Sequence, residues 1–205
     1  MKYQFVSIEG NIGAGKTTLA TKLADHYQGK LLLESFSDNP FLSSFYNDAD
    51  RNALPLELHF LIDRLNQFKN IDFKASAPVI SDYMFVKSKI YAGVTLNDDE
   101  FGLYQKIFDL ITPDVPKPEL LIYLHSPINK LKNNIKKRGR SYEQNISSDY
   151  LEKIQNAYQP YLKQYQRVLL VEMNQADFEN PDHFKQLTDF LEKDYDFTNY
   201  TLTIQ

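Results

Sequence analysis

The sequence contains 205 residues, of which 42% are hydrophobic and 24% charged, and its formal net charge is −4. This length and composition are typical of a globular protein that buries a sizeable core. The charge excludes a bulk basic field of the kind that binds nucleic acid or an anionic membrane. A local basic cluster is nevertheless present at Lys132, Lys136, Lys137, Arg138 and Arg140. The chain has no cysteine, which excludes disulfides, thiolate metal sites and cysteine nucleophiles.

No apolar run approaches the roughly 18 residues that span a bilayer. The first ten residues, MKYQFVSIEG, lack the apolar stretch and the small-residue cleavage site of a signal peptide. We therefore expect a cytoplasmic protein with neither a membrane nor a nucleic-acid partner.

Short apolar runs alternate with amphipathic stretches along the chain. The runs predict five strands, at Tyr3–Ile8, Lys30–Glu34, Pro78–Asp82, Leu120–His125 and Val168–Glu172. The stretches predict helices at Thr17–Tyr27, Leu54–Asn70, Asp98–Ile111, Ile128–Arg138, Asp149–Gln166 and Pro181–Tyr195. This order predicts an α/β fold in which helices cover both faces of a five-stranded parallel sheet. Because no linker or repeat interrupts it, we expect one domain over residues 1–205. The tail, 197–205, is either a frayed end or a small edge strand.

The strongest motif lies between the first predicted strand and the first predicted helix. It matches G-x-x-x-x-G-K-[ST] in full, as Gly10-Asn11-Ile12-Gly13-Ala14-Gly15-Lys16-Thr17. In such a loop, backbone N–H groups and the helix N-terminus surround a polyphosphate. We expect this segment, extended to Thr18, to bind ATP. Lys16 would lie near the β and γ phosphates, and the Thr17 hydroxyl would bind Mg²⁺.

Two carboxylates are predicted at the carboxyl ends of strands beside this loop, where ligands bind in parallel sheets. Glu34 ends the second predicted strand, and a carboxylate there could accept the proton of an alcohol that attacks phosphorus. Its alternative is a solvated strand-end residue. Asp82 ends the third strand, and it would orient Mg²⁺ through water, cap the following helix, or do both.

The segment 134–146 combines Arg138, Gly139 and Arg140 and is interpreted as a basic lid that closes over the phosphates and excludes water. The alternative is a solvated helix end, where cations are also favourable. The chain has no N/T-K-x-D string, which a GTPase would use to read guanine, and it is too small for the extra domains of most mechanical ATPases. A phosphate loop with a basic lid in a chain of this size favours a small-molecule kinase.

These motifs together resemble the deoxynucleoside kinase family, through GNIGAGKTTLA, Glu34, NPFLSSFY and RGRSYE. The segments ESFSDNPFL, SDYMFVKSKIYA and KKRGRSYEQNI are most similar to its bacterial deoxyguanosine and deoxyadenosine kinase branch. The resemblance implies transfer of the ATP γ-phosphoryl group to the 5′-hydroxyl of a deoxynucleoside, and a homodimer built on a helix pair that includes Leu54–Asn70. It implies these roles: Glu34 as general base, Tyr46 and Glu143 on the 3′-hydroxyl, Arg138 and Arg140 on the phosphates, Arg64 near the base, and Asp177-Phe178 around the adenine of ATP.

The sequence departs from the family at three positions. Tyr83 stands where relatives often have an arginine that approaches the 5′-oxygen, and Lys87 is either its substitute or a surface lysine. Glu57 falls where many relatives have a base-reading glutamine. A carboxylate accepts hydrogen bonds only, which favours the N–H groups of a purine. Asn134 replaces a frequent lid arginine.

Two other hypotheses remain. In a nucleotide kinase of the thymidylate type, the acceptor already carries a phosphate that an arginine neutralises, and Tyr83 stands in that position. A non-catalytic nucleotide-binding subunit would lack part of the set Lys16, Thr17, Glu34 and the lid arginines, all of which are present. A deoxynucleoside kinase with a purine preference remains the main hypothesis, with deoxyadenosine expected first and deoxyguanosine or deoxycytidine next.

Overall fold

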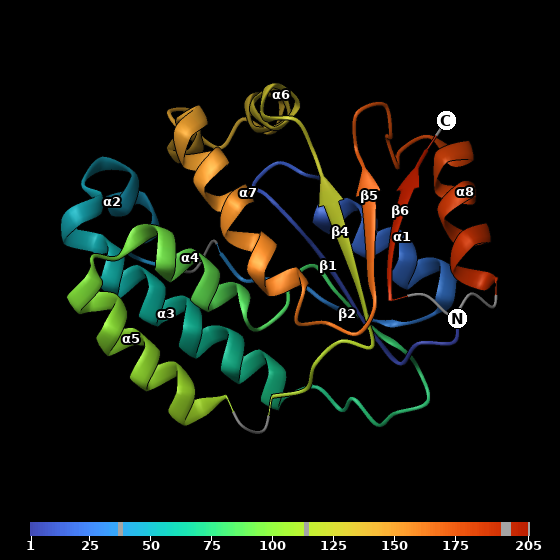
Figure 1. Cartoon of the computed structure of the whole chain (residues 1–205), viewed down its shortest axis with the longest axis horizontal. Coiled ribbons are helices and arrows are strands. Elements are labelled where there is room, and N and C mark those ends of the chain that lie inside the picture. The colour runs from blue at the N-terminus through green and yellow to red at the C-terminus, as the bar shows by residue number, and fades with distance from the viewer. Residues whose placement is uncertain (37–38, 113–114, 194–197, 205) are drawn as a thin grey trace.

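The computed structural model describes residues 1–36, 39–112, 115–193 and 198–204. Its described part forms a six-stranded, entirely parallel sheet in the order β2-β3-β1-β4-β5-β6 (Figure 1). The strands are β1 (Phe5–Gly10), β2 (Lys30–Leu32), β3 (Val79–Ser81), β4 (Leu120–His125), β5 (Val168–Glu172) and β6 (Asn199–Thr203).

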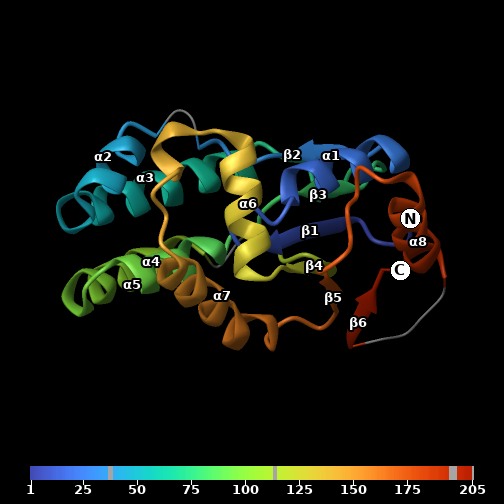
Figure 2. The same ribbon diagram turned by 90° about the horizontal axis from the view of Figure 1, so that it is seen from above.

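Helices cover both faces of this sheet, as the predicted α/β fold requires (Figure 2). They are α1 (Lys16–Tyr27), α2 (Leu42–Asn47), α3 (Ala49–Lys69), α4 (Lys87–Thr95), α5 (Asp98–Ile111), α6 (Ile128–Arg138), α7 (Ser148–Leu162) and α8 (Pro181–Glu192), with a 3₁₀ turn, η1, at Ser141–Glu143.

Alternation along the central strands divides the core between the two faces. On β4, Ile122 and Leu124 pack in a cluster with side chains of α1, α6 and α8. Leu121 and Tyr123 point to the opposite face and pack with side chains of α4 and α7. Because successive side chains of a strand point to opposite faces, an apolar strand of this kind must be covered on both sides.

The sheet differs from the prediction by one strand and by the positions of several strand ends. β6 is the sixth strand, so the edge-strand interpretation of the tail is correct for 199–203, whereas Phe197 and Gln205 lie outside the described residues. β1 runs from Phe5 to Gly10 rather than from Tyr3 to Ile8, because its ladder with β4 continues to the pair of Gly10 and Leu124.

Strands β2 and β3 end earlier than predicted, which leaves Glu34 and Asp82 in the loops that follow them. β2 pairs with β3 only over Lys30–Leu32. The backbone N–H of Glu34 instead donates to Asp82 Oδ1, at 2.8 Å. Asp82 does not cap the next helix, because α4 begins only at Lys87 and Val86 occupies its N-cap position.

Helix boundaries also differ from the prediction, and α2 and α4 are additional to the six predicted helices. α3 starts at Ala49 because Asp48 caps it, its side chain accepting the N–H of Arg51. α7 ends at Leu162 rather than Gln166, and the backbone continues in tight turns. α8 ends at Glu192, and Tyr195 lies outside the described residues.

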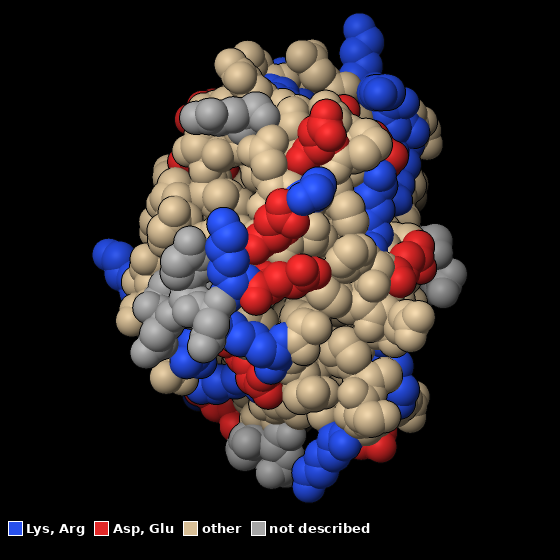
Figure 3. All heavy atoms as spheres, turned by 90° about the vertical axis from the view of Figure 1, so that its right-hand side faces the viewer, with Lys and Arg blue, Asp and Glu red and all other residues tan. Residues whose placement is uncertain are grey.

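On the face that α8 and β6 form, acidic and basic side chains are interspersed (Figure 3), in line with the small net charge. In the described parts of the chain, no helix combines the length and the apolar character needed to cross a membrane.

Candidate active site

The loop between β1 and α1 has the backbone that a phosphate-binding loop requires. Gly13 and Gly15 have φ of 82° and 93°, in the left-handed region that favours glycine. A Cβ on Gly13 would also approach Leu131 O to 2.9 Å, because the loop packs closely against α6. Gly15 caps α1 without a side-chain hydrogen bond, and the first turn of α1 holds no acidic residue. The N–H groups of that turn can therefore donate to an anion.

Side chains from the loop and from α6 fix its shape. Asn11 Nδ2 donates to Leu151 O of α7 at 2.7 Å, and Asn134 Nδ2 donates to Gly13 O at 2.8 Å. Asn134 thus links α6 to the loop. Lys16 Nζ donates to Asn11 O at 2.9 Å. Burial lowers the pKa of Lys16 to about 8, with Lys87 acting in the same direction.

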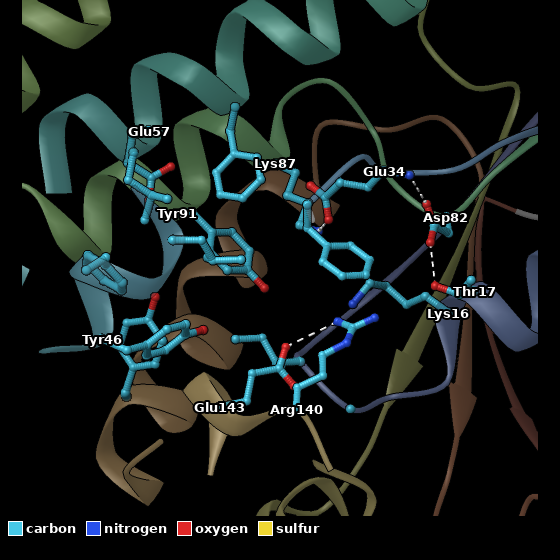
Figure 4. A pocket seen from close by; sticks show the side chains of 18 of the residues that line it. Lys16, Thr17, Glu34, Tyr46, Glu57, Asp82, Lys87, Tyr91, Arg140 and Glu143 are labelled. Carbon is cyan, nitrogen blue, oxygen red and sulfur yellow. Dashed lines mark hydrogen bonds and ion pairs between the residues drawn. The ribbon is translucent and has the colours of Figure 1, made fainter. Parts of the chain in front are cut away.

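Thr17 and Asp82 face each other beside this loop. The Thr17 hydroxyl donates to Asp82 Oδ2 at 2.5 Å, and Asp82 Oδ1 accepts from the backbone of Glu34 (Figure 4). A hydroxyl and a carboxylate both offer oxygen ligands, which Mg²⁺ prefers. The two side chains fit a Mg²⁺ ion whose remaining ligands are water and phosphate oxygens. Burial raises the pKa of Asp82, and the neighbouring Glu34 raises it further.

Glu34 is held between two cations that come from different helices. Arg64 of α3 donates to Oε1 through Nε at 2.9 Å and through Nη2, and Lys87 of α4 donates to Oε2 at 2.6 Å. Burial alone would raise the pKa of Glu34, but Lys87 and Arg64 outweigh it and hold that pKa well below its ordinary value. Lys87 is 4% exposed, so it is not a surface lysine.

A cavity opens between Glu34 and the helices α2, α3 and α4, with about 820 Å³ of empty space when its open mouth is included. Lys16, Thr17 and Asp82 lie at one end, and Glu57, Tyr91 and Tyr46 at the other (Figure 4). Aromatic and aliphatic side chains line the space between the two ends: Ile12, Phe36, Leu42, Phe45, Leu56, Phe60 and Tyr150. This combination of apolar walls and a few polar groups is typical of a small-molecule site.

Glu57 is the polar group at the far end of this cavity. It is 2% exposed, and its Oε1 accepts from the Thr95 hydroxyl at 3.0 Å. Its Oε2 is buried and has no hydrogen-bond partner among the described residues, and the same holds for the Tyr91 hydroxyl. Burial raises the pKa of Glu57 to about 7, although Arg64 and Lys87 oppose that change. Unpartnered buried polar atoms are costly, so this end of the cavity is built for a polar ligand.

The predicted lid places its charged side chains over the cavity. Glu143 is 5% exposed, and it accepts from Arg138 Nη2 and, at 3.3 Å, from Arg140 Nη1. The guanidinium of Arg140 also lies 3.7 Å from the centre of the Phe36 ring. Tyr46 is stacked on Tyr142 of the lid, with ring centres 5.9 Å apart.

A second, wider groove lies on the other side of the phosphate loop. Its lining includes Gly15, Thr18, Lys130, Asp177 and Phe178, so the structure brings the predicted adenine segment to the loop. The two cavities share five residues, which are Gly13, Lys16, Thr17, Arg138 and Arg140. Gly10 and Asn11 line neither cavity, and Asn11 instead attaches the loop to α7 through its bond to Leu151 O.

The chain is similar to known proteins in both sequence and fold. The family model "Deoxynucleoside kinase" matches residues 6–195. The chain belongs to the deoxynucleoside kinase family. It is 38% identical over 200 residues to a deoxyguanosine kinase of Bacillus subtilis (strain 168), covering 89% of this chain and 97% of that protein. It is 30% identical over 188 residues to a deoxyadenosine kinase of Dictyostelium discoideum, covering 89% of this chain and 76% of that protein.

A solved structure of deoxyadenosine kinase from M. mycoides with bound dCTP has the same fold. It superposes with a TM-score of 0.79 over 91% of this chain and 98% of that chain, at 21% identity. The resemblance inferred from the motifs and the predicted fold class are therefore confirmed.

Sequence reasoning missed several residues of this deoxynucleoside kinase site. Tyr91 lies one helical turn beyond Lys87 on α4, so its spacing of four could have placed both on one face. Lys130 lines the second groove, and its Nζ donates to Met173 O at 2.5 Å and to Ala176 O at 2.7 Å. No local signal predicts that contact, because the two segments lie more than 40 residues apart.

Proposed function

We propose that this chain transfers the γ-phosphoryl group of ATP to the 5′-hydroxyl of a deoxynucleoside and prefers a purine base. One observation carries the proposal: Glu34 lines a cavity that shares the phosphate-loop residues Gly13, Lys16 and Thr17 with the second groove. The groove beside Asp177 and Phe178 would hold the adenosine of ATP. A phosphoryl group at the shared residues could then be reached from both sides.

Glu34 accepts the proton of the attacking alcohol. Its two cations keep it ionised, so it can accept a hydrogen bond from the 5′-hydroxyl throughout the reaction. A carboxylate with a lowered pKa is a weak base, and a free alcohol is a very weak acid. The proton therefore moves late, when the oxygen is already bonding to phosphorus, in a loose transition state.

The cations around the shared residues stabilise the charge that spreads over the transferring group. Lys16 lies at the loop, and Arg138 and Arg140 reach the same space from the lid. For these arginines to contact phosphate, their bonds to Glu143 must loosen, which links lid position to the presence of ATP. Thr17 and, through water, Asp82 would hold Mg²⁺, which neutralises phosphate charge when bound.

The far end of the acceptor cavity would bind the base and the sugar. Tyr46 and Glu143 lie on the lid side of the cavity, where they would bind the 3′-hydroxyl. Glu57, with its unpartnered oxygen, would read the base. An ionised carboxyl accepts two N–H groups, as the N1–H and amino group of guanine offer. A neutral carboxyl accepts one and donates one, as the amino group and N1 of adenine require.

The resemblance implied a place near the base for Arg64, but its guanidinium also reaches the Glu34 end of the cavity. It bonds to Glu34 and, through Nη1, to the Ser88 hydroxyl at 2.7 Å. Lys87 reaches Glu34 from the other side, which supports its proposed substitution for the arginine that Tyr83 replaces. Tyr83 itself is fully buried in an aromatic cluster, and its hydroxyl donates to Gln67. With Arg64 and Lys87 already paired to Glu34, the cavity favours an uncharged acceptor over a nucleoside monophosphate.

The same proposal includes a homodimer built on α3 and α5. These helices contact each other, and their outer faces carry the most exposed large apolar side chains of the described residues. Leu110 is 80% exposed, Ile62 56% and Leu103 51%. Exposed apolar groups gathered on neighbouring helices are typical of a protein–protein interface.

The direct test is a Mg·ATP assay with deoxyadenosine, deoxyguanosine, deoxycytidine, thymidine and dAMP. We expect turnover of the two purine deoxynucleosides and no turnover of dAMP. In Glu34→Gln we expect kcat to fall by about 100-fold or more, which is the usual contribution of a general base, while ATP affinity stays unchanged. Asp109→Asn, a surface carboxylate paired with Lys89, is the control. The proposal would be refuted if dAMP were phosphorylated faster than the deoxynucleosides, or if Glu34→Gln kept full activity.

A further inference from the structure

Glu9 is a fully buried carboxylate that the proposed mechanism does not use. It lies on β1, one residue before Gly10, and is 0% exposed. Burial raises its pKa, which Lys87 and Lys16 partly oppose. Burying a charge costs on the order of several kcal/mol, and an apolar residue of similar size would often be more stabilising. A residue that carries such a cost calls for a function beyond filling space.

The two oxygens of Glu9 bind segments that are far apart in the sequence. Oε1 accepts the backbone N–H of Met84 at 2.7 Å. Oε2 accepts the Tyr158 hydroxyl of α7 at 2.7 Å and, more weakly, the N–H of Gly10 at 3.3 Å. In Figure 1, α7 and α4 lie side by side next to the carboxyl end of β1, and α4 and α7 are in contact. Glu9 is therefore the point at which the phosphate-loop strand, the β3–α4 turn and α7 are joined.

The bond to Met84 acts on the segment that places Lys87. The N–H of Met84 is held by Glu9, and its carbonyl accepts the N–H of Lys87 at 3.0 Å. Lys87 is the first residue of α4, so Met84, whose N–H and carbonyl lie in two successive peptide groups and are both bonded, helps to set where the helix begins. Asp82 and Lys87, which bracket the turn, contact Glu34 through its backbone and its side chain respectively. A shift of Met84 would displace a cation from Glu34.

We infer that Glu9 is a positioning residue for phosphoryl transfer: through Met84 it fixes the β3–α4 turn so that Lys87 pairs with Glu34 and orients it toward the phosphate loop. The inference rests on the proposed function. Glu9 acts because its side chain is long enough to reach Met84, not because it is charged. Its bond to Tyr158 plays no part in this role.

Two conservative substitutions separate reach from charge. Glu9→Gln removes the charge but keeps an oxygen at the distance that Met84 requires. Glu9→Asp keeps the charge but withdraws the oxygen by one methylene, roughly 1.5 Å. We expect kcat for the deoxynucleoside to fall by about tenfold in Glu9→Asp and by less than about threefold in Glu9→Gln. The dissociation constant of ATP alone should change by less than about twofold in both, because the weak bond to Gly10 is the only loop contact involved and the bonds of Asn11 and Asn134 still hold the phosphate loop.

A double substitution tests whether Glu9 acts through Lys87. If it does, Glu9→Asp should lower kcat by less than about twofold in a Lys87→Met background, since the shared effect is already lost. Tyr158→Phe is the matched control, because it removes the other bond to Glu9 and should leave kcat within about twofold. Thermal unfolding of each variant shows whether the protein measured is folded.

The results distinguish a role of Glu9 through its reach to Met84 from a role through its charge. A loss in Glu9→Gln equal to that in Glu9→Asp would overturn the inference in favour of a charge effect. Effects of Glu9→Asp and Lys87→Met that multiply, or a Tyr158→Phe loss as large as that of Glu9→Asp, would overturn it as well. Should Glu9→Asp not fold, an unchanged kcat in Glu9→Gln would support the inference and a tenfold fall would refute it. Wild-type protein that phosphorylates no deoxynucleoside would instead refute the proposed function.

Discussion

At the scale of single residues, Glu57 offers a chemical reason for pH-dependent choice between purines. Burial raises its pKa to about 7, and one of its oxygens has no partner among the described residues. The groups that act on its charge are Arg64 and Lys87, which favour the ionised form, and Glu34, which opposes it. In the proposed site, the neutral carboxyl that dominates below about pH 7 would complement adenine, and the carboxylate that dominates at higher pH would complement guanine.

We therefore predict that the ratio of kcat/KM for deoxyguanosine to that for deoxyadenosine rises by about tenfold from pH 6 to pH 8. In Glu57→Gln the ratio should favour deoxyadenosine and stay flat, because an amide offers one acceptor and one donor at either pH. Thr95→Val removes a bond that stabilises the ionised form, so the transition should move to higher pH. A flat ratio in the wild type would contradict this reading of Glu57.

The same carboxyl gives a prediction for stability. The pKa of Glu57 is higher in the folded protein than the 4.5 of an ordinary glutamate. The folded state therefore binds more protons between about pH 4.5 and pH 7. The stabilisation is complete below about pH 4.5 and is lost as pH rises toward 7. Urea unfolding of wild type and Glu57→Gln across this range should show a difference in unfolding free energy that changes with pH. A pH-independent difference would be contrary to this expectation.

At the scale of elements, α6 connects the lid, the phosphate loop and the second groove, which Asp177 and Phe178 line. Asn134 bonds to Gly13 O, Arg138 reaches Glu143, and Lys130 holds the carbonyls of Met173 and Ala176. The segment before Asp177 and Phe178 is thereby attached to the lid helix. We expect Lys130 to shape the adenine end of the groove more than the phosphate end.

Lys130→Met should accordingly raise the KM for ATP by about three- to tenfold while kcat changes little. Competition experiments distinguish the two ends of the groove, since inorganic triphosphate would report a phosphate contact and ATP would report both. We expect weaker binding of ATP and unchanged binding of triphosphate. Lys132→Met, an exposed lysine on the same helix, serves as the control. Equal weakening of ATP and triphosphate would show that Lys130 contacts phosphate instead.

Elements also show which parts of the site could be predicted from the sequence. The phosphate loop depends on consecutive residues, so its glycines, Lys16 and Thr17 were predictable from one motif. The position of Lys87 was not, because its alternatives, surface lysine or partner of Glu34, differ only in how α4 packs against α3. Glu9 carries no local signal, since its partners Met84 and Tyr158 are 75 and 149 residues away.

Strand ends were likewise predictable where the local pattern sets them and unpredictable where distant residues do. Apolar runs placed the central strands β4 and β5 correctly because burial on both faces leaves a continuous apolar pattern. β2 ended early because a side chain, that of Asp82, took the N–H of Glu34. β6 was left open because its residues are mostly exposed, and only the free edge of β5 decides that it pairs. Local sequence patterns do not predict long-range strand pairing of this kind.

At the scale of the whole molecule, the exposed apolar faces of α3 and α5 lie away from the sheet, at the end of the molecule formed by the helices α2 to α5 (Figure 1). Leu103 and Leu110 are seven residues apart on α5, so they share one face of that helix. Helix α3 also carries Arg64, which bonds to Glu34, and Glu57. A partner packed on α3 would therefore support the wall of the acceptor cavity.

We predict that Leu110→Glu weakens dimer formation by more than about tenfold, because burying one leucine contributes about 1.5–3 kcal/mol and a charge in its place adds a desolvation cost. Sedimentation velocity across a concentration series measures the shift toward monomer. Leu31→Glu on β2, which changes an exposed leucine far from α5, is the matched control. If α3 relies on its partner, the KM for the deoxynucleoside should rise in the monomer while the KM for ATP stays constant. A wild-type protein that sediments as a monomer at every concentration would rule out the dimer.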